Sequence, residues 1–126
     1  MSALRVLVAD DDPSARALLS SILRAAGFSD IVQVVDGHAA LARLRDPDRF
    51  ALAFLDIAMP GFSGIEVLTM AKTCQPNCRW VIVSGNSALE NVLAALHAGA
   101  SSFVVKPYSM NKIYDAFARC GVQSPH

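Results

Sequence analysis

The sequence predicts an α/β fold, a single domain built on a doubly wound, five-stranded parallel sheet. Five short apolar runs, rich in Val and Leu, alternate with longer segments whose apolar residues recur at helical spacing. Of the 126 residues, 53% are apolar and only 17% are charged, which favours a sheet that is buried on both faces. Strands that alternate with helices form βα units, and such units place their strands parallel in one sheet.

The apolar runs and helical patterns give the order of the elements. The runs predict strands at residues 4–9, 31–35, 50–55, 79–83 and 102–105. The patterns between them predict helices at about residues 13–26, 37–45, 64–74, 87–97 and 109–120. We expect residues 1–121 to form the one domain and residues 122–126 to form a short polar tail.

Capping residues justify where the helices begin. Asp12 followed by Pro13 is typical of a helix N-cap with proline at the first helical position. Asp36 precedes a glycine and opens the second helix. Ser63 stands three residues before Glu66, which is the spacing of a capping box, and it therefore predicts the start of the third helix.

Polar residues directly follow four of the five predicted strands. Asp10 and Asp11 follow the first strand, Asp56 the third, Ser84 the fourth and Lys106 the fifth. Asp10 and Asp11 have no evident structural role of their own. Parallel strands bring these positions to one edge of the sheet, where open α/β sheets bind their ligands. Taken alone, Asp56 fits a turn or a helix cap equally well.

Three carboxylates at one edge create an electrostatic problem. Two of them about 5 Å apart repel by roughly 3 kcal/mol at an effective dielectric constant near 20, so the group needs cations. Lys106 supplies one positive charge, and Mg²⁺, which prefers oxygen ligands, would supply two. An ammonium, a hydroxyl and Mg²⁺ are also what phosphoryl transfer needs. Asp56 is then a candidate nucleophile that forms an acyl phosphate.

Composition and charge argue against several other classes. The formal net charge is zero and no basic stripe is visible, so we expect no direct contact with nucleic acid. No apolar run reaches the roughly 18 residues of a membrane span and no signal peptide is evident, so we expect a cytoplasmic protein without a membrane contact. Cys74, Cys78 and Cys120 are odd in number and lack partners at zinc-ligand spacing, so they are interpreted as reduced thiols.

Several motifs at the ends of the predicted strands occur in an informative order. They are the acidic pair Asp10-Asp11, the acceptor candidate Asp56, the Met59-Pro60-Gly61 turn with Gly64, Ser84-Gly85, and Lys106-Pro107. In this order they resemble the receiver domain of two-component response regulators of the chemotaxis, or CheY-like, type. The resemblance covers nearly the whole chain. It implies a flavodoxin-like fold with strand order 2-1-3-4-5.

The resemblance implies a metal site around the phosphoacceptor. Asp56 is implied to accept the phosphoryl group and to be one ligand of Mg²⁺. Asp11 is implied to bind the metal directly, and Asp10 to hold it through water. The backbone carbonyl of Ala58 would complete the protein's share of the coordination.

The resemblance also implies groups that bind the phosphate and respond to it. Lys106 and Ser84 would each bind a phosphoryl oxygen, and Ser84 would move toward the phosphate. Phe103 stands where the family keeps an aromatic that turns inward with this motion. A phenylalanine here also fits an ordinary core aromatic, and it lacks the phenolic oxygen of a tyrosine. The bond between Lys106 and Pro107 is implied to be cis, which is otherwise rare.

The implied function is signalling. A histidine kinase or a phosphotransfer protein would phosphorylate Asp56, and the domain would change conformation to control an output partner that the sequence does not identify. The chain would catalyse only its own phosphorylation and dephosphorylation, so we do not class it as an enzyme. A homodimer is one candidate assembly, through the face formed by helix 87–98, strand 102–105 and helix 109–120, because the first of these is unusually apolar.

Three alternatives remain open at this point. A pseudo-receiver would act as an interaction module without phosphorylation, although the intact acid pair and Lys106 argue against it. A haloacid-dehalogenase-like phosphatase with an aspartate nucleophile needs a second aspartate two residues after the first, where this chain has Ala58. A flavodoxin-like cofactor binder needs a phosphate loop of Gly, Ser and Thr after the first strand, where this chain has three acids.

Overall fold

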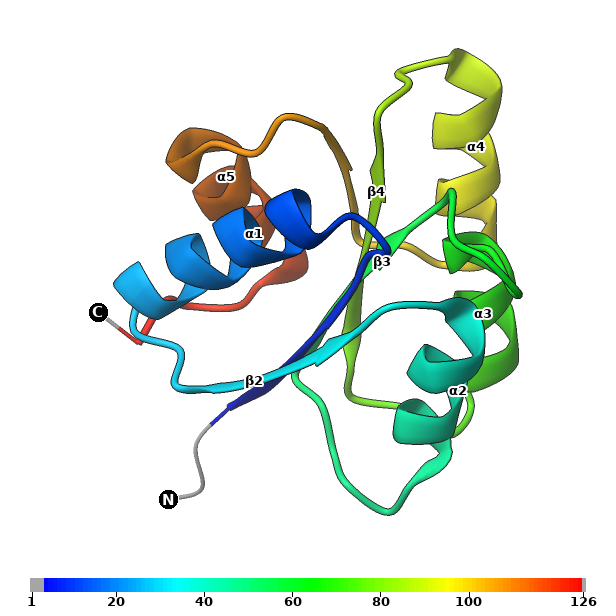
Figure 1. Cartoon of the computed structure of the whole chain (residues 1–126), viewed down its shortest axis with the longest axis horizontal. Helices are drawn as coiled ribbons and strands as arrows, with labels where there is room; N and C mark the ends of the chain where they lie inside the picture. Colours follow the sequence, from blue (N-terminus) through cyan, green and yellow to red (C-terminus); the bar gives the residue numbers. More distant parts are fainter. Residues whose placement is uncertain (1–3, 126) are drawn as a thin grey trace.

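The computed structural model describes residues 4–125, which contain five strands and five helices (Figure 1). The strands are β1 Arg5–Ala9, β2 Asp30–Val34, β3 Leu52–Asp56, β4 Arg79–Ser84 and β5 Ser102–Val105. The helices are α1 Pro13–Ala25, α2 Gly37–Arg45, α3 Gly64–Ala71, α4 Leu89–Ala98 and α5 Met110–Cys120. Within this part of the chain, none of the helices is long and apolar enough to cross a membrane.

All five strands are parallel and form one sheet in the order β2-β1-β3-β4-β5. The predicted fold class and the strand order implied by the resemblance are both confirmed. The register places Ala9 beside Leu55 and Ser84 beside Val105. Because the strands run in one direction, the residues at their carboxyl ends meet at the same edge of the sheet.

The helices cover both faces of the sheet. α1 and α5 lie on one face, whereas α2, α3 and α4 lie on the other (Figure 1). Alternate residues of a strand point to opposite faces. Val6 and Phe54 therefore pack in one core cluster, and Leu7 and Leu55 pack in the other. The central strand β3 is buried along its whole length, which explains why its sequence is a continuous apolar run rather than an alternating one.

The predicted helix caps are present. The Asp12 carboxylate accepts a hydrogen bond from the Ser14 N–H at 3.0 Å, and Pro13 is the first residue of α1. Ser63 and Glu66 form a reciprocal capping box at the start of α3. Each cap satisfies a backbone N–H that has no partner inside the helix, so these side chains fix where the helices begin.

Helix α4 begins at Leu89, two residues later than predicted. Ser84 Oγ accepts a hydrogen bond from the Asn86 N–H at 3.0 Å, and Asn86 Oδ1 accepts one from the Ala88 N–H at 2.8 Å. These two side chains hold the segment as consecutive turns and keep it out of the helix. Ala88, the N-cap residue, offers no side-chain hydrogen bond of its own.

Strands β2 and β3 also differ from the predicted ranges. β2 begins at Asp30, one residue early, where its carboxylate bonds with Arg5 Nε of the neighbouring strand at 3.0 Å. β3 begins at Leu52, two residues late, because the Phe50 N–H donates to Gln75 Oε1 at 3.1 Å instead of to a strand. The remaining element ends agree with the prediction to within three residues.

Two of the three cysteines are buried and all three are free. Burial raises the pKa of Cys78 to about 12 and that of Cys120 to about 11. Both groups therefore stay protonated at neutral pH, and a protonated thiol is a poor nucleophile and a poor metal ligand.

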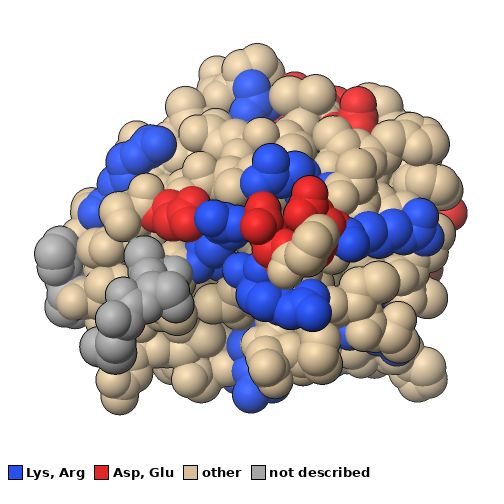
Figure 2. Space-filling model, turned by 90° about the horizontal axis from the view of Figure 1, so that it is seen from below, with Lys and Arg blue, Asp and Glu red and all other residues tan. Residues whose placement is uncertain are grey.

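Gln75 joins two loops at the amino-terminal edge of the sheet, opposite the predicted site. Its side chain is fully enclosed, with 1% of the residue exposed. Nε2 donates to the carbonyls of Leu44 at 2.9 Å and Asp48 at 2.7 Å, and Oε1 accepts from the Phe50 N–H. Acidic and basic side chains intermingle on the surface around this end (Figure 2), where Arg5 pairs with Asp48 at 2.8 Å.

We predict that Gln75→Met lowers the free energy of unfolding by about 2–3 kcal/mol, because the change leaves buried backbone groups without hydrogen bonds. Urea denaturation of the variant and the wild type measures the difference. Gln33→Met is the matched control, since Gln33 lies exposed on β2 and its replacement should change stability by less than about 0.5 kcal/mol. Equal effects of the two substitutions would contradict the role given to Gln75.

Candidate functional site

Lys106 joins two carboxylates at the carboxyl-terminal edge of the sheet. Asp10 directly follows β1, and Asp56 is the last residue of the neighbouring strand β3. Lys106 Nζ lies 2.7 Å from Asp56 Oδ2 and 2.8 Å from Asp10 Oδ2. The backbone N–H of Lys106 donates to the carbonyl of Ser84 at 2.9 Å. Four residues that the sequence places at separate strand ends are therefore close together in space.

Asp10 is buried and serves two purposes. It is 1% exposed, and its Oδ1 accepts a hydrogen bond from the Asp12 N–H at 2.9 Å. The expectation that Asp10 lacks a structural role is therefore wrong, because this bond shapes the turn into α1. Oδ2 forms the ion pair with Lys106 but has no partner in regular hydrogen-bond geometry. One buried carboxylate oxygen is thus left with capacity for a further ligand.

Asp56 combines the two interpretations that the sequence left open. It is 4% exposed, and its Oδ1 accepts a hydrogen bond from the Ala58 N–H at 3.1 Å, as in a turn. Its Oδ2 is bonded to Lys106. The turn orients the carboxylate, and the ammonium compensates part of the cost of burying it.

Asp11 lies exposed at the rim and completes a group of three carboxylates. One oxygen each from Asp10, Asp11 and Asp56 lies within 4.8 Å of the others. Three hard oxygen donors in this arrangement fit a divalent cation such as Mg²⁺. The ion pair of the buried Asp10 Oδ2 with Lys106 at 2.8 Å shows that this oxygen already attracts a cation, which supports that fit. Three carboxylates and the single ammonium of Lys106 carry a net negative charge when ionised. This charge also favours binding of a divalent cation.

Burial and shared charge shift the acid–base properties of the cluster. Burial raises the pKa of Asp56 above its ordinary value, and the hydrogen bonds from Lys106 and the Ala58 N–H offset only part of this rise. Burial lowers the pKa of Lys106, but its contacts with Asp10 and Asp56 outweigh burial, so the net shift is upward. The two shifts agree physically because one ammonium is divided between two carboxylates and stabilises each incompletely.

Ser84 and Phe103 occupy the positions expected of them along β4 and β5. Ser84 ends β4 with 5% exposure, and its Oγ accepts the Asn86 N–H while keeping a proton to donate. Phe103 is half-buried and packs against the core cluster beneath α2, α3 and α4. The Lys106–Pro107 peptide bond is cis.

Two glycines allow the loop after Asp56 to pass close to other chain segments. A Cβ atom on Gly64 would lie 2.5 Å from the carbonyl oxygen of Asp56, so a larger residue would push α3 away from the end of β3. Gly61 adopts a φ of +78°, in the region that residues with a Cβ rarely occupy. Both positions of the motif after Asp56 thus have a steric reason to be glycine.

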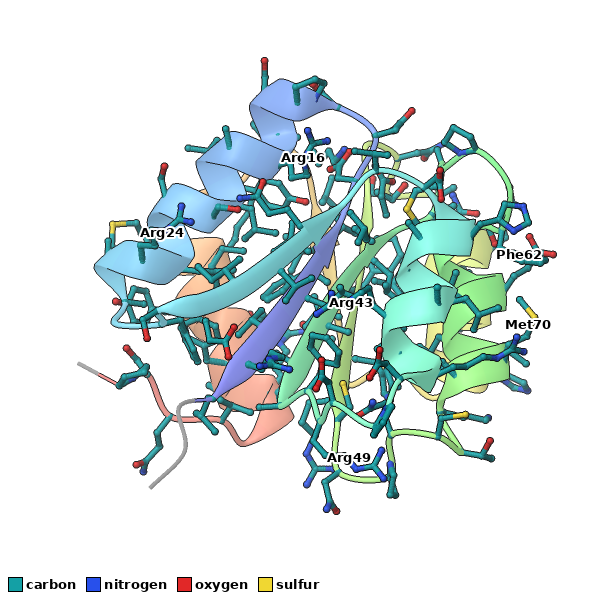
Figure 3. The ribbon with its side chains drawn as sticks, turned by 60° about the horizontal axis from the view of Figure 1, so that its bottom comes forward. Arg16, Arg24, Arg43, Arg49, Phe62 and Met70 are labelled. Carbon is teal, nitrogen blue, oxygen red and sulfur yellow. The ribbon has the colours of Figure 1, made fainter. Side chains whose placement is uncertain are left out.

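Two residues beside the cluster were not predicted from the sequence. Arg16 reaches back from α1 toward the end of β1 (Figure 3), and its Nη1 donates to the Asp10 carbonyl at 2.8 Å. Tyr108 is 8% exposed, and its hydroxyl faces the Asp10 carboxylate. A cation near the start of a helix opposes the helix dipole, which is a signal that could have drawn attention to Arg16. Tyr108 carries no comparable signal, because an aromatic residue after a proline fits any core.

The family is decided by comparison with known proteins. The model of the response regulator receiver domain matches residues 6–118. The chain belongs to the response regulator receiver domain family. The predicted resemblance is therefore confirmed, and the cluster described above lies at the end of the sheet where this receiver domain brings β1, β3 and β5 together.

Relatives of this receiver domain include stand-alone and larger proteins. Chemotaxis protein CheY of Thermotoga maritima is 29% identical over 114 residues, which cover 89% of this chain and 92% of that protein. The DNA-binding response regulator MtrA of Mycolicibacterium smegmatis is 33% identical over 111 residues, which cover 86% of this chain but only 46% of MtrA. The receiver domain thus spans less than half of this second relative.

Solved structures give the same picture of the receiver domain. The CheX-CheY-BeF3-Mg+2 complex from Borrelia burgdorferi matches with a TM-score of 0.86 and 28% identity, covering 95% of this chain and 90% of the matched chain. A CheY-like receiver domain protein from Methanospirillum hungatei matches with a TM-score of 0.84 and 28% identity, covering 93% and 92%.

We predict that Lys106→Met strengthens Mg²⁺ binding roughly tenfold, because the cation no longer competes with an ammonium for the oxygens of Asp10 and Asp56. Calorimetric titration of the purified protein with Mg²⁺ measures this change. Lys72→Met is the control, since Lys72 is the exposed C-cap residue of α3 and bonds the Ala98 carbonyl at 3.1 Å. Unchanged or weaker binding by Lys106→Met would show that Lys106 and the metal do not share this site.

Proposed function

We propose that this receiver domain, residues 1–121, accepts a phosphoryl group on Asp56 from a histidine kinase or a phosphotransfer protein. The observation that carries the proposal is the joint contact of Lys106 Nζ with Asp56 at 2.7 Å and Asp10 at 2.8 Å, beside the third carboxylate of Asp11. These contacts support the proposal because a carboxylate nucleophile, an ammonium and oxygen ligands for a metal are the groups that phosphoryl transfer needs.

The proposed metal is Mg²⁺. Asp11 and Asp56 would bind it directly, Asp10 through water, and the Ala58 carbonyl would be a further ligand. When bound, Mg²⁺ neutralises charge on the carboxylates and on the phosphoryl oxygens. The exposed position of Asp11 leaves one ligand of the proposed site open to solvent, from which the cation would enter.

The chain's own residues carry the transfer. A carboxylate oxygen of Asp56 attacks phosphorus while the bond between phosphorus and the donor breaks, and the donor keeps that electron pair. Lys106 then exchanges its contact with Asp56 for one with a phosphoryl oxygen, which offsets charge spread over those oxygens. The Ser84 hydroxyl donates a hydrogen bond to a second phosphoryl oxygen and keeps its proton. The product is an acyl phosphate, so the chain modifies itself and turns over no separate substrate.

The proposed response is a population shift between two conformations. When Ser84 bonds the phosphate, its hydrogen bond from the Asn86 N–H would either break or move with the side chain. That hydrogen bond shapes the segment before α4. Phe103 on the adjacent strand would move inward as the Ser84 side chain leaves its present place. The contact of Phe103 with the core beneath α4 supports this link.

We further propose that the face formed by α4, β5 and α5 contacts the output partner, with a second copy of this chain as the candidate to test first. Leu89, Leu93 and Leu96 of α4 are 70%, 52% and 51% exposed, which is unusual for apolar side chains. β5 is an edge strand that pairs only with β4 in the described sheet. A cytoplasmic location and the lack of direct nucleic-acid contact belong to the same proposal.

Incubation with Mg²⁺ and acetyl phosphate, followed by intact mass and peptide mapping, tests the function. We expect one phosphoryl group per chain on Asp56, lost in Asp56→Asn. Asp36→Asn is the matched control, because asparagine also caps a helix and Asp36, the cap of α2, is not one of the three clustered carboxylates. Sedimentation of the labelled and unlabelled protein, and of Leu93→Glu on α4, reports whether a dimer forms and whether α4 mediates it. Absence of label, or label elsewhere, would instead favour a pseudo-receiver.

A further inference from the structure

Lys112 holds the chain on both sides of Lys106. Its Nζ donates to the carbonyl of Val105 at 2.9 Å and to the carbonyl of Pro107 at 3.0 Å. Lys112 is the third residue of α5, and its own backbone N–H is capped by Ser109 Oγ at 3.2 Å. The first turn of α5 is therefore bonded to the carbonyls of the two residues on either side of Lys106.

The position of Lys112 is unfavourable by local criteria. A cation in the first turn of a helix opposes the helix dipole, and fixing a long lysine side chain costs conformational entropy. Its two charge-assisted hydrogen bonds compensate these costs. β5 has a neighbour on one side only, so the segment that leaves it lacks the support of a second strand. Lys112 provides donors to that segment.

The position of the Lys106 side chain depends on the backbone that Lys112 holds. Its N–H is fixed by the Ser84 carbonyl, and its Nζ must span to two carboxylates on different strands. A small rotation of the backbone at Lys106 would swing the long side chain away from Asp56. Such a rotation would move the carbonyls of Val105 and Pro107 relative to each other. Lys112 resists it because it bonds both of them.

We infer that Lys112 is a positioning residue for phosphoryl transfer to Asp56: by bonding the carbonyls of Val105 and Pro107, it holds the Lys106 ammonium over the reacting carboxylate. This inference rests on the proposed function. Lys112 is exposed and touches neither Asp56 nor the other carboxylates in the contacts of the described residues, so it acts through Lys106 alone.

The test compares the rate of Asp56 phosphorylation by acetyl phosphate at saturating Mg²⁺ in a set of lysine variants. We expect Lys112→Gln to react roughly tenfold more slowly, less than the ~100-fold loss that a misplacement of about 1 Å at the reacting atoms can cause. Lys112→Arg keeps the charge and the donors and should stay close to the wild-type rate. Lys72→Gln removes another lysine-to-carbonyl contact, to Ala98 at 3.1 Å, and should not change the rate.

Two further readouts separate positioning from a general structural role. The thermal midpoint of Lys112→Gln should match that of Lys72→Gln, and its Mg²⁺ affinity should not fall. In the metal-free protein, side-chain NMR of Lys106 should show a more mobile Nζ in Lys112→Gln than in Lys72→Gln.

The outcomes are distinguishable. Slow labelling with retained stability and a mobile Lys106 supports the inference. A wild-type rate in Lys112→Gln, an immobile Lys106, or a rate loss accompanied by a lower midpoint than that of Lys72→Gln overturns it. A wild-type protein that takes no label on Asp56 contradicts the proposed function, whereas the NMR comparison still decides whether Lys112 positions Lys106.

Discussion

The close packing of three carboxylates and one ammonium at the carboxyl-terminal edge of the sheet is the interaction that organises this receiver domain. Three carboxylates lie within 4.8 Å of one another, two of them almost without solvent contact, and Lys106 is shared between those two. Buried carboxylates are tolerated only with opposite charge and hydrogen bonds close by. The cluster therefore favours binding of a cation, and in the function proposed above it would respond when an anionic phosphoryl group draws Lys106 away from Asp56.

A series of hydrogen bonds connects the cluster with the exposed start of α4. Lys106 and Ser84 are joined through the backbone, Ser84 is bonded to the Asn86 N–H, and Asn86 in turn bonds the Ala88 N–H where α4 begins. A displacement at Ser84 consequently bears on a chain of specific hydrogen bonds that ends at a helix with exposed leucines. Lys112 bonds the carbonyls of Val105 and Pro107 on the α5 side of Lys106. Lys106 therefore lies between the segment before α4, which is proposed to move, and the start of α5, which Lys112 holds in place.

Much of this architecture could be predicted because its signals are local. The cap formed by Asp12, the capping box at Ser63, and the apolar runs that stop at a charged residue all depend on neighbouring positions in the sequence. Parallel strands then bring Asp56 and Lys106 to one edge by geometry alone. The order of the strands followed only from the resemblance, since periodicity carries no information about which strands are neighbours.

Most of the contacts that escaped prediction run from long polar side chains to backbone carbonyls. Arg16, Lys112 and Gln75 each donate to carbonyls, and every residue has a carbonyl, so their partners leave no mark in the sequence. The late start of α4 escaped for a related reason. Asn86 fits a helix or a turn, and its hydrogen bond to Ala88 decides for the turn only in the folded chain.

Calorimetric titration of the metal-free protein with Mg²⁺, in which Asp11→Asn is compared with Asp12→Asn, shows whether the three carboxylates form one cation site. Asp12 caps α1, a role that asparagine retains, so this control changes one nearby carboxylate without touching the cluster. The account predicts one Mg²⁺ per chain for the wild type and for Asp12→Asn, and at least about tenfold weaker binding for Asp11→Asn. Equal affinities in the two variants, or no saturable binding by the wild type, would contradict it.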